Sequence, residues 1–303
     1  PQTLIKNSNV KIVCTTDDPA DDLKYHALLA KEKDFDCKVL PGFRPDKALG
    51  IELPGFAEYI KKLGESAGVE IKSYKDVISA LLARIDFFNA AGCRVSDHAF
   101  SYMPYVQDSE EQIEASFERA MSGEKISQRD ADAYKTAVMQ VLGEKYHSLG
   151  WAMEIHIGAM RNNNSKMFAA LGPDTGFDSV GDDKTAYMLS RFLDSLCSRD
   201  KLPKTVLFNL NSKDNIVLAT MLGNFQSSEV ESKIQFGPAW WFLDTMDGMT
   251  QQLKCLANLG ILGKFIGMET DSRSFTSYGR HDYFRRILCR LIGRWVEDGW
   301  YAN

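Results

Sequence analysis

Charged and imidazole side chains recur directly after short apolar or β-branched runs of this chain. They are Asp17, Arg44, Asp97, His98, His156, Asp271 and Arg273. Carboxylates and imidazoles can take up and deliver protons, and a guanidinium fork matches the two oxygens of a carboxylate. If the runs are parallel strands, their carboxyl ends converge on one face, and the spacing then predicts the site of an enzyme.

Seven runs have the composition of strands and alternate with longer segments whose apolar residues recur at helical spacing. The runs are residues 10–15, 37–42, 93–96, 153–157, 205–210, 234–237 and 265–268. Helical spacing is clearest at 78–88, 246–259 and 281–297. This alternation predicts βαβ units around a parallel sheet, as in a (β/α)8 barrel. Seven strands do not close such a barrel, so either one strand escapes the pattern or one is absent.

Two connections are too long for simple crossovers. Residues 45–91 and 103–149 are predicted to be helical insertions, the second with a helix start at Ser109. Insertions of this kind usually cover an active site or a partner interface. We find no linker or internal repeat, and therefore expect one domain over residues 1–303.

The composition narrows the class of partner. The chain has 303 residues, of which 44% are hydrophobic and 25% charged, and a formal net charge of -5. This charge offers no basic field to nucleic acid or anionic lipid, so a small molecule is the expected ligand. The six cysteines stand singly, without a CxxC pair, and no secretory leader or membrane-spanning run is found. We expect reduced core cysteines, no zinc-thiolate site and a cytoplasmic protein.

Longer phrases of the chain carry a resemblance to a known family. They are residues 14–19 (CTTDDP), 42–46 (GFRPD), 97–98 (DH), 154–164 (EIHIGAMRNNN), 235–237 (QFG), 240–242 (WWF), 270–275 (TDSRSF) and 280–286 (RHDYFRR). In this order they resemble uronate isomerase (glucuronate isomerase) of the amidohydrolase superfamily, over essentially the whole chain.

The resemblance implies a distorted (β/α)8 barrel that interconverts D-glucuronate with D-fructuronate and D-galacturonate with D-tagaturonate (EC 5.3.1.12). Members of the family hold one divalent metal, Zn2+ or Mn2+, with a His-x-His pair after the first strand and an aspartate after the eighth. On this mapping Asp271 is that aspartate and the seven runs are strands two to eight. The chain contains no His-x-His, so the first strand and its metal ligands are expected to be missing.

The resemblance also suggests roles. Asp271 would ligate the metal and relay protons, and His156 would bind the metal or a substrate oxygen. Arg273 and Arg44 would clamp the carboxylate or the enediolate. Asp97 would orient His98 or a substrate hydroxyl, with His98 counted among the substrate contacts. Trp240 or its neighbour Trp241 would form an apolar wall for the sugar.

Each role has a simpler alternative. Asp271 and Arg273 could be a strand-end ion pair, and His156 a hydrogen-bonded core histidine. The aspartates at 17–22 could cap the following helix, and the tryptophans could serve packing alone. His26, His147 and His281 fall on helical segments, where surface or capping roles are the default, and 162–164 is expected to be a turn.

Three functions remain open. The first is a uronate isomerase of which these residues are the C-terminal two-thirds, or whose N-terminal part lies in another chain. The 303 residues alone would then be catalytically incomplete, because two metal ligands are lacking. The second is a metal-dependent hydrolase of the same superfamily, acting on a lactone or ester. The third is a non-catalytic fragment. An open barrel edge also leaves backbone groups unpaired, which predicts homo-oligomers or association with a missing N-terminal segment.

Overall fold

Six parallel strands carry the fold in the computed structural model, which describes residues 1–302. β1 pairs with β2, and β3, β4, β7 and β8 follow one another in a second sheet. Isolated bridges from Asp17 to Phe43 and from Phe43 to Ser96 join the two sheets. The bounds are Ile12–Cys14 (β1), Lys38–Leu40 (β2), Val95–Phe100 (β3), Ala152–Ile157 (β4), Lys204–Asn209 (β7) and Ile234–Phe236 (β8). The predicted α/β class with a parallel sheet is confirmed.

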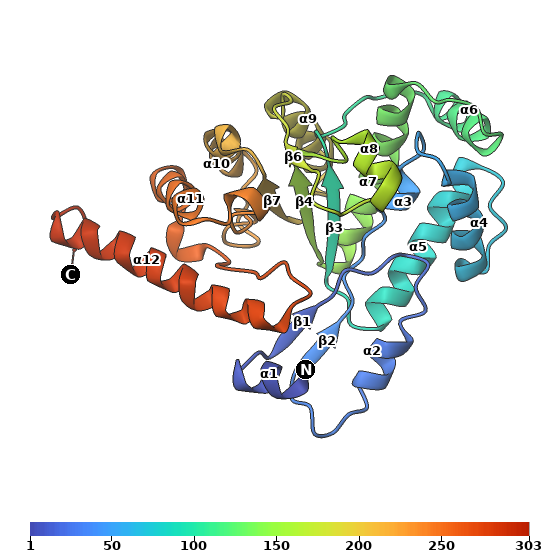
Figure 1. Cartoon of the computed structure of the whole chain (residues 1–303). Helices are drawn as coiled ribbons and strands as arrows, with labels where there is room; N and C mark the ends of the chain where they lie inside the picture. The colour runs from blue at the N-terminus through green and yellow to red at the C-terminus, as the bar shows by residue number, and fades with distance from the viewer. Residues whose placement is uncertain (303) are drawn as a thin grey trace.

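Helices surround the strands. In Figure 1, α3 to α7 gather on one side of the central strands, α9 to α11 on the other, and α12 runs from beside β1 to the C-terminus. The bounds are Gln2–Asn7 (α1), Lys24–Leu29 (α2), Asp46–Leu49 (α3), Phe56–Ala67 (α4), Tyr74–Ala90 (α5), Glu110–Met121 (α6), Gln128–Leu149 (α7), Ser165–Leu171 (α8), Ala186–Cys197 (α9), Asn215–Asn224 (α10), Met246–Leu259 (α11) and Gly279–Glu297 (α12).

The predicted helical segments are confirmed. Residues 78–88 lie in α5, 246–259 are α11, and 281–297 lie in α12. The long connections hold α3 to α5 and α6 to α7. Ser109 caps α6 by accepting a hydrogen bond from the backbone N–H of Gln112, as expected for a serine at this position.

Alternation along the strands divides their side chains between two environments. Ser96 and His98 of β3 are fully buried, and the ring of His98 contacts Tyr146 of α7. Asp97 between them points the other way, toward Arg44. The helix-facing side belongs to the main hydrophobic core, which includes Phe43, Trp151, Ile155 and Leu207. The opposite face is therefore left for polar side chains.

The predicted strand at 265–268 is wrong. A 3-10 turn occupies Leu262–Lys264, and the following residues have no regular structure. Gly267 adopts φ +88°, a left-handed conformation that interrupts an extended run. The structure also has a short antiparallel pair that the sequence pattern did not predict, β5 (Ala159–Met160) with β6 (Ser179–Val180), on either side of α8.

All six cysteines are free. The expectation that they are core residues holds for Cys37 and Cys93 but is wrong for Cys14 and Cys289, which are exposed. Within residues 1–302, no helix combines the length and apolar character needed to cross a membrane.

Candidate active site

A line of three charged or imidazole side chains crosses the polar face of the sheet. Arg44 donates from Nη1 to Oδ2 of Asp97 at 3.1 Å and from Nε to Asp46 at 2.8 Å. The other oxygen of Asp97, Oδ1, lies 3.0 Å from Nδ1 of His156. Asp97 and His156 are each 9% exposed, on the neighbouring strands β3 and β4. The sheet thus brings together three of the predicted residues.

Short backbone contacts place Arg44 in this line. Its neighbour Phe43 has no exposed surface, donates its N–H to Val95 at 3.1 Å and accepts from the N–H of Asp97 at 2.9 Å. The Phe43 ring is therefore fixed in the core beside Phe88, with centroids 5.1 Å apart. Alternation then directs Arg44 to the opposite, polar face.

Asp97 and His156 form a close contact without the angles of a hydrogen bond. Oδ1 of Asp97 and Nδ1 of His156 have no hydrogen-bond partner although both are buried. Burial raises the pKa of Asp97, but His156 and Arg44 outweigh this effect and leave the pKa below its ordinary value. Asp97 therefore stays ionised, and can hold a proton on Nδ1 of His156 while Nε2 serves a substrate.

Aromatic rings fix the imidazole of His156. Phe208 of β7 stacks on it with centroids 3.9 Å apart and planes 15° apart. Trp240 meets it nearly edge-on at 4.7 Å. The imidazole is thus buried between aromatic rings and faces a carboxylate, an arrangement shared by a catalytic histidine and by the alternative of a core histidine.

Asp271 joins the group through Trp240. The indole Nε1 of Trp240 donates to Oδ2 of Asp271 at 3.0 Å. Arg273 is exposed, and the structure of residues 1–302 gives it no hydrogen bond or ion pair. The strand-end ion pair between Asp271 and Arg273 that we considered as an alternative is therefore not formed.

Two acidic residues near this group were not among the predicted site residues. Burial, reinforced by Glu269 and Asp97, raises the pKa of Glu154 well above its ordinary value. Partial burial likewise raises the pKa of Glu269, although His156 opposes it and the side chain remains exposed. Alternation from His156 along β4 could have identified Glu154, two residues away on the same face. Glu269 carried no such signal, because its segment forms no strand.

The structure places His98 and Asp17 apart from this line. His98 is fully buried against Tyr146, its Nε2 lies 3.1 Å from Oγ of Ser96, and burial lowers its pKa to about 3. This position does not favour the predicted substrate contact. Asp17 accepts from Thr15 at 2.6 Å and from the N–H of Gly42 at 3.2 Å, and so joins the ends of β1 and β2.

The aspartates that follow Asp17 accept from backbone N–H groups at the entrance to α2, although its N-cap residue, Leu23, makes no side-chain capping bond. Asp21 accepts from the N–H of Leu23 at 2.7 Å, and Asp22 from that of Lys24 at 3.1 Å, at the start of α2. Asn164, which follows β4 in the sequence, caps α8.

The residues that the structure describes do not supply a complete set of donor atoms for a divalent metal. Among residues 1–302, no three or more His, Cys, Asp or Glu side chains are grouped so as to hold a metal ion. His156 faces Asp97, and one oxygen of Asp271 already accepts from Trp240. The described side chains therefore do not fit a self-sufficient metal centre, although His156 and Asp271 are chemically suitable donors.

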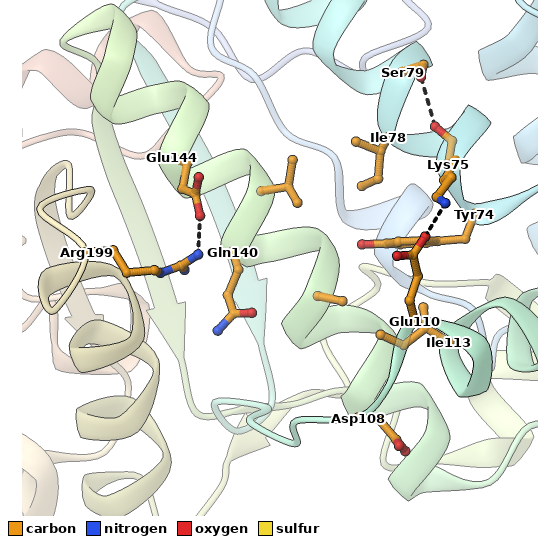
Figure 2. A pocket seen from close by; sticks show the side chains of 12 residues that line it. Tyr74, Lys75, Ile78, Ser79, Asp108, Glu110, Ile113, Gln140, Glu144 and Arg199 are labelled. Carbon is orange, nitrogen blue, oxygen red and sulfur yellow. Dashed lines mark hydrogen bonds and ion pairs between the residues drawn. The ribbon is translucent and has the colours of Figure 1, made fainter.

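A separate groove lies elsewhere on the molecule. It has a volume of about 580 Å³ and is lined by α5, α6, α7 and Arg199. Figure 2 shows Lys75 paired with Glu110 on one side and Arg199 with Glu144 on the other. Its charges are already paired and none of the candidate active-site residues lines it, so we do not assign the chemistry to this groove.

The chain resembles known proteins over its whole length. A family model described as glucuronate isomerase matches residues 1–303. The uronate isomerase of Caldanaerobacter subterraneus subsp. tengcongensis is 55% identical over 302 residues, which are 100% of this chain and 65% of that protein. The uronate isomerase of Clostridium acetobutylicum is 54% identical over 99% of this chain and 64% of that protein.

Solved structures agree with the sequence relatives. The crystal structure of uronate isomerase from Thermotoga maritima matches with a TM-score of 0.91 and 35% identity, over 100% of this chain and 65% of that one. The glucuronate isomerase of Caulobacter crescentus, at 24% identity and a TM-score of 0.90, shows the same fold. The chain thus spans about 65% of the length of these relatives. By its full-length match to the family model, the chain belongs to the glucuronate isomerase (uronate isomerase) family.

Proposed function

We propose that this chain is part of an aldose–ketose isomerase (EC 5.3.1.12) that interconverts D-glucuronate with D-fructuronate and D-galacturonate with D-tagaturonate. The observation that carries the proposal is the line from Arg44 through Asp97 to His156, with Asp271 held beside it by Trp240. Family membership supports the proposed substrate class, and the geometry supports the proposed roles.

The reaction moves a carbonyl group between C1 and C2 of the open-chain sugar. A proton leaves C2, a proton reaches C1, and an enediolate exists between these steps. In the proposal, His156 exchanges the proton through Nε2, because Asp97 lies against Nδ1 and favours a proton there. Asp271 has one oxygen free of the Trp240 hydrogen bond and serves as a second proton carrier.

Arg44 is the proposed clamp for the negatively charged substrate. Burial lowers the pKa of its guanidinium, but Asp46 and Asp97 more than offset this and hold the group charged. A fork of N–H donors can bind both oxygens of a carboxylate or an enediolate. Arg273, exposed beside Asp271, is proposed as a further substrate contact, and Trp240 as part of the apolar wall.

A divalent Zn2+ or Mn2+ would stabilise the enediolate as a Lewis acid when bound. Its proposed donors in this chain are Asp271 and His156, the latter through Nε2 in place of carrying the proton. Because residues 1–302 contain no group of three such donors, we expect residues 1–303 alone to bind hexuronate but to turn it over slowly or not at all.

The test is an NMR assay of the chain with D-glucuronate in D2O, with Zn2+ or Mn2+ supplied. Saturable binding, with ketose or deuterium at C2 in any turnover, would support the proposal. Hydrolysis of a hexuronolactone without ketose would instead identify the metal-dependent hydrolase. Absence of both binding and turnover would overturn the isomerase proposal and favour a non-catalytic chain.

Arg44→Lys sharpens this test, because lysine keeps the charge but loses the fork. We expect hexuronate affinity to fall by about tenfold, which corresponds to roughly 1.4 kcal/mol. Arg94→Lys is the matched control: Arg94 is exposed and bonds only nearby atoms of Cys93 and Asn89. Equal effects of the two substitutions would remove Arg44 from the site.

The proposal extends to location and assembly. Six free cysteines support a reducing, cytoplasmic setting. β1 and β8 have no strand partner on their outer sides within residues 1–302, which supports self-association or pairing with another segment.

A further inference from the structure

Trp240 contacts both proposed proton carriers at once. Its indole N–H donates to Asp271 at 3.0 Å, and its ring lies 4.7 Å from the imidazole of His156. We propose that Trp240 is a positioning residue that sets the relative placement of Asp271 and His156. The inference rests on the proposed function for its catalytic consequence, but the contact itself can be tested without turnover.

The carboxylate depends on this contact because its backbone is poorly supported. Asp271 lies in a segment without regular structure and adopts φ +39°, an uncommon conformation for a residue other than glycine. The side chain is exposed, and no other hydrogen bond or ion pair holds it among the described residues. The Trp240 N–H therefore fixes one oxygen and leaves the other available.

The position of the His156 imidazole also depends on the Trp240 indole. Phe208 stacks on one face of His156, and Trp240 approaches at a plane angle of 62°. Phe208 packs closely against Gly237, since a Cβ on that glycine would lie 2.1 Å from its ring. His156 is thus held between the Phe208 ring and the indole.

Trp240 is itself well anchored. It is 7% exposed, and its carbonyl accepts from the N–H of Leu243 at 2.8 Å. Upstream, Gln252 of α11 donates to the carbonyl of Gly237 at 3.1 Å and secures the end of β8. Because Trp240 is anchored near the end of β8, its indole can hold Asp271, in the irregular segment, in a defined position relative to that strand.

The indole of Trp240 can position a neighbouring side chain without acting as an acid or a base itself. The Nε1–H group only donates and does not exchange roles with an acid or a base. Trp240 can therefore orient the carboxylate without competing for the proton that moves. Loss of this contact should lower kcat more than it raises KM, because small displacements of a catalytic group slow the chemical step.

The first experiment is an NMR measurement of the indole N–H resonances in the full chain, which has five tryptophans. Trp240→Phe assigns the resonance. Asp271→Gly then removes the acceptor while suiting the positive φ, so this variant is not expected to misfold. We expect the Trp240 resonance to shift and its hydrogen to exchange faster with solvent. An unchanged resonance and exchange rate would overturn the proposal.

The second experiment compares Trp240→Phe with Trp151→Phe. Trp151 is a matched control, since it is fully buried and its Nε1 donates to Asn89 at 3.0 Å, on the helix-facing side. We expect Trp240→Phe to lower kcat about 10- to 100-fold and to raise KM by a smaller factor, because phenylalanine keeps an apolar wall, and Trp151→Phe to leave both unchanged. Equal losses in the two variants would mean a structural role only and overturn the proposal. If no variant and no wild-type chain acts on hexuronate, the proposed function fails, and the NMR result still decides the contact.

Discussion

At the scale of single residues, His98 predicts how stability depends on pH. Burial lowers its pKa from 6.5 to about 3 in the folded protein. Between these values the unfolded chain binds the proton and the folded chain does not, so stability falls as the pH drops from about 6.5 toward 3. From pH 6.5 to pH 5 the loss from this residue is roughly 1 to 2 kcal/mol.

The measurement is urea unfolding at both pH values for the wild type and for His98→Leu, which cannot bind a proton. The variant should lose less stability than the wild type on acidification, by about that amount. Parallel pH dependence of the two proteins would show that His98 does not titrate in this range on unfolding.

The residue types and spacing predicted part of this site. Arg44, Asp97 and His156 were found because strand-end residues of neighbouring parallel strands meet on one face. The partner of Asp97 was not predicted: Asp97 faces His156 on the neighbouring strand, not the adjacent His98. Adjacent residues of a strand point to opposite faces, so Asp97 and His98 could not share a site.

At the scale of elements, alanine substitutions at two glycines in the C-terminal part of the chain should change stability in opposite directions. Gly267 has φ +88° in the segment before Asp271, whereas Gly293 lies inside α12 without a positive φ, and a Cβ at either position would meet no neighbour. Gly267→Ala should destabilise the protein by about 1 kcal/mol through backbone strain. Gly293→Ala should stabilise it by up to about 1 kcal/mol through helix propensity.

Chemical unfolding of both variants tests these two predictions. Each variant adds the same methyl group, so opposite signs of the change in unfolding free energy report the effect of backbone conformation. Stabilisation by Gly267→Ala would mean that the segment is extended there, as residues 265–268 were first predicted to be. The sequence misled at this point because the apolar run is strand-like in composition, while a glycine permits a conformation that composition does not report. Runs that pair with a neighbour on the sheet, such as 153–157, were predictable.

At the scale of the whole molecule, the hydrophobic clusters predict where the structure opens first. The main core joins β3, β4, β7 and β8 to the surrounding helices. β1 and β2 instead contribute to a small cluster around Ile5, Phe35 and Cys37, with Tyr278 packed against it. Regions with few buried apolar contacts open at lower free energy. We therefore expect backbone amides of β1 and β2 to exchange with solvent well before those of β3 and β4.

Hydrogen exchange followed by mass spectrometry would measure the order in which these strands open. This order also matters for the candidate active site. Arg44 follows β2 in sequence, yet Phe43 is bonded to Val95 and Asp97 of β3, so its amide should exchange with the slow group. Arg44 would then keep its place beside Asp97 while the strand that leads to it opens. Exchange of Phe43 together with β1 and β2 would contradict this, because the arginine would then leave the site in each opening event.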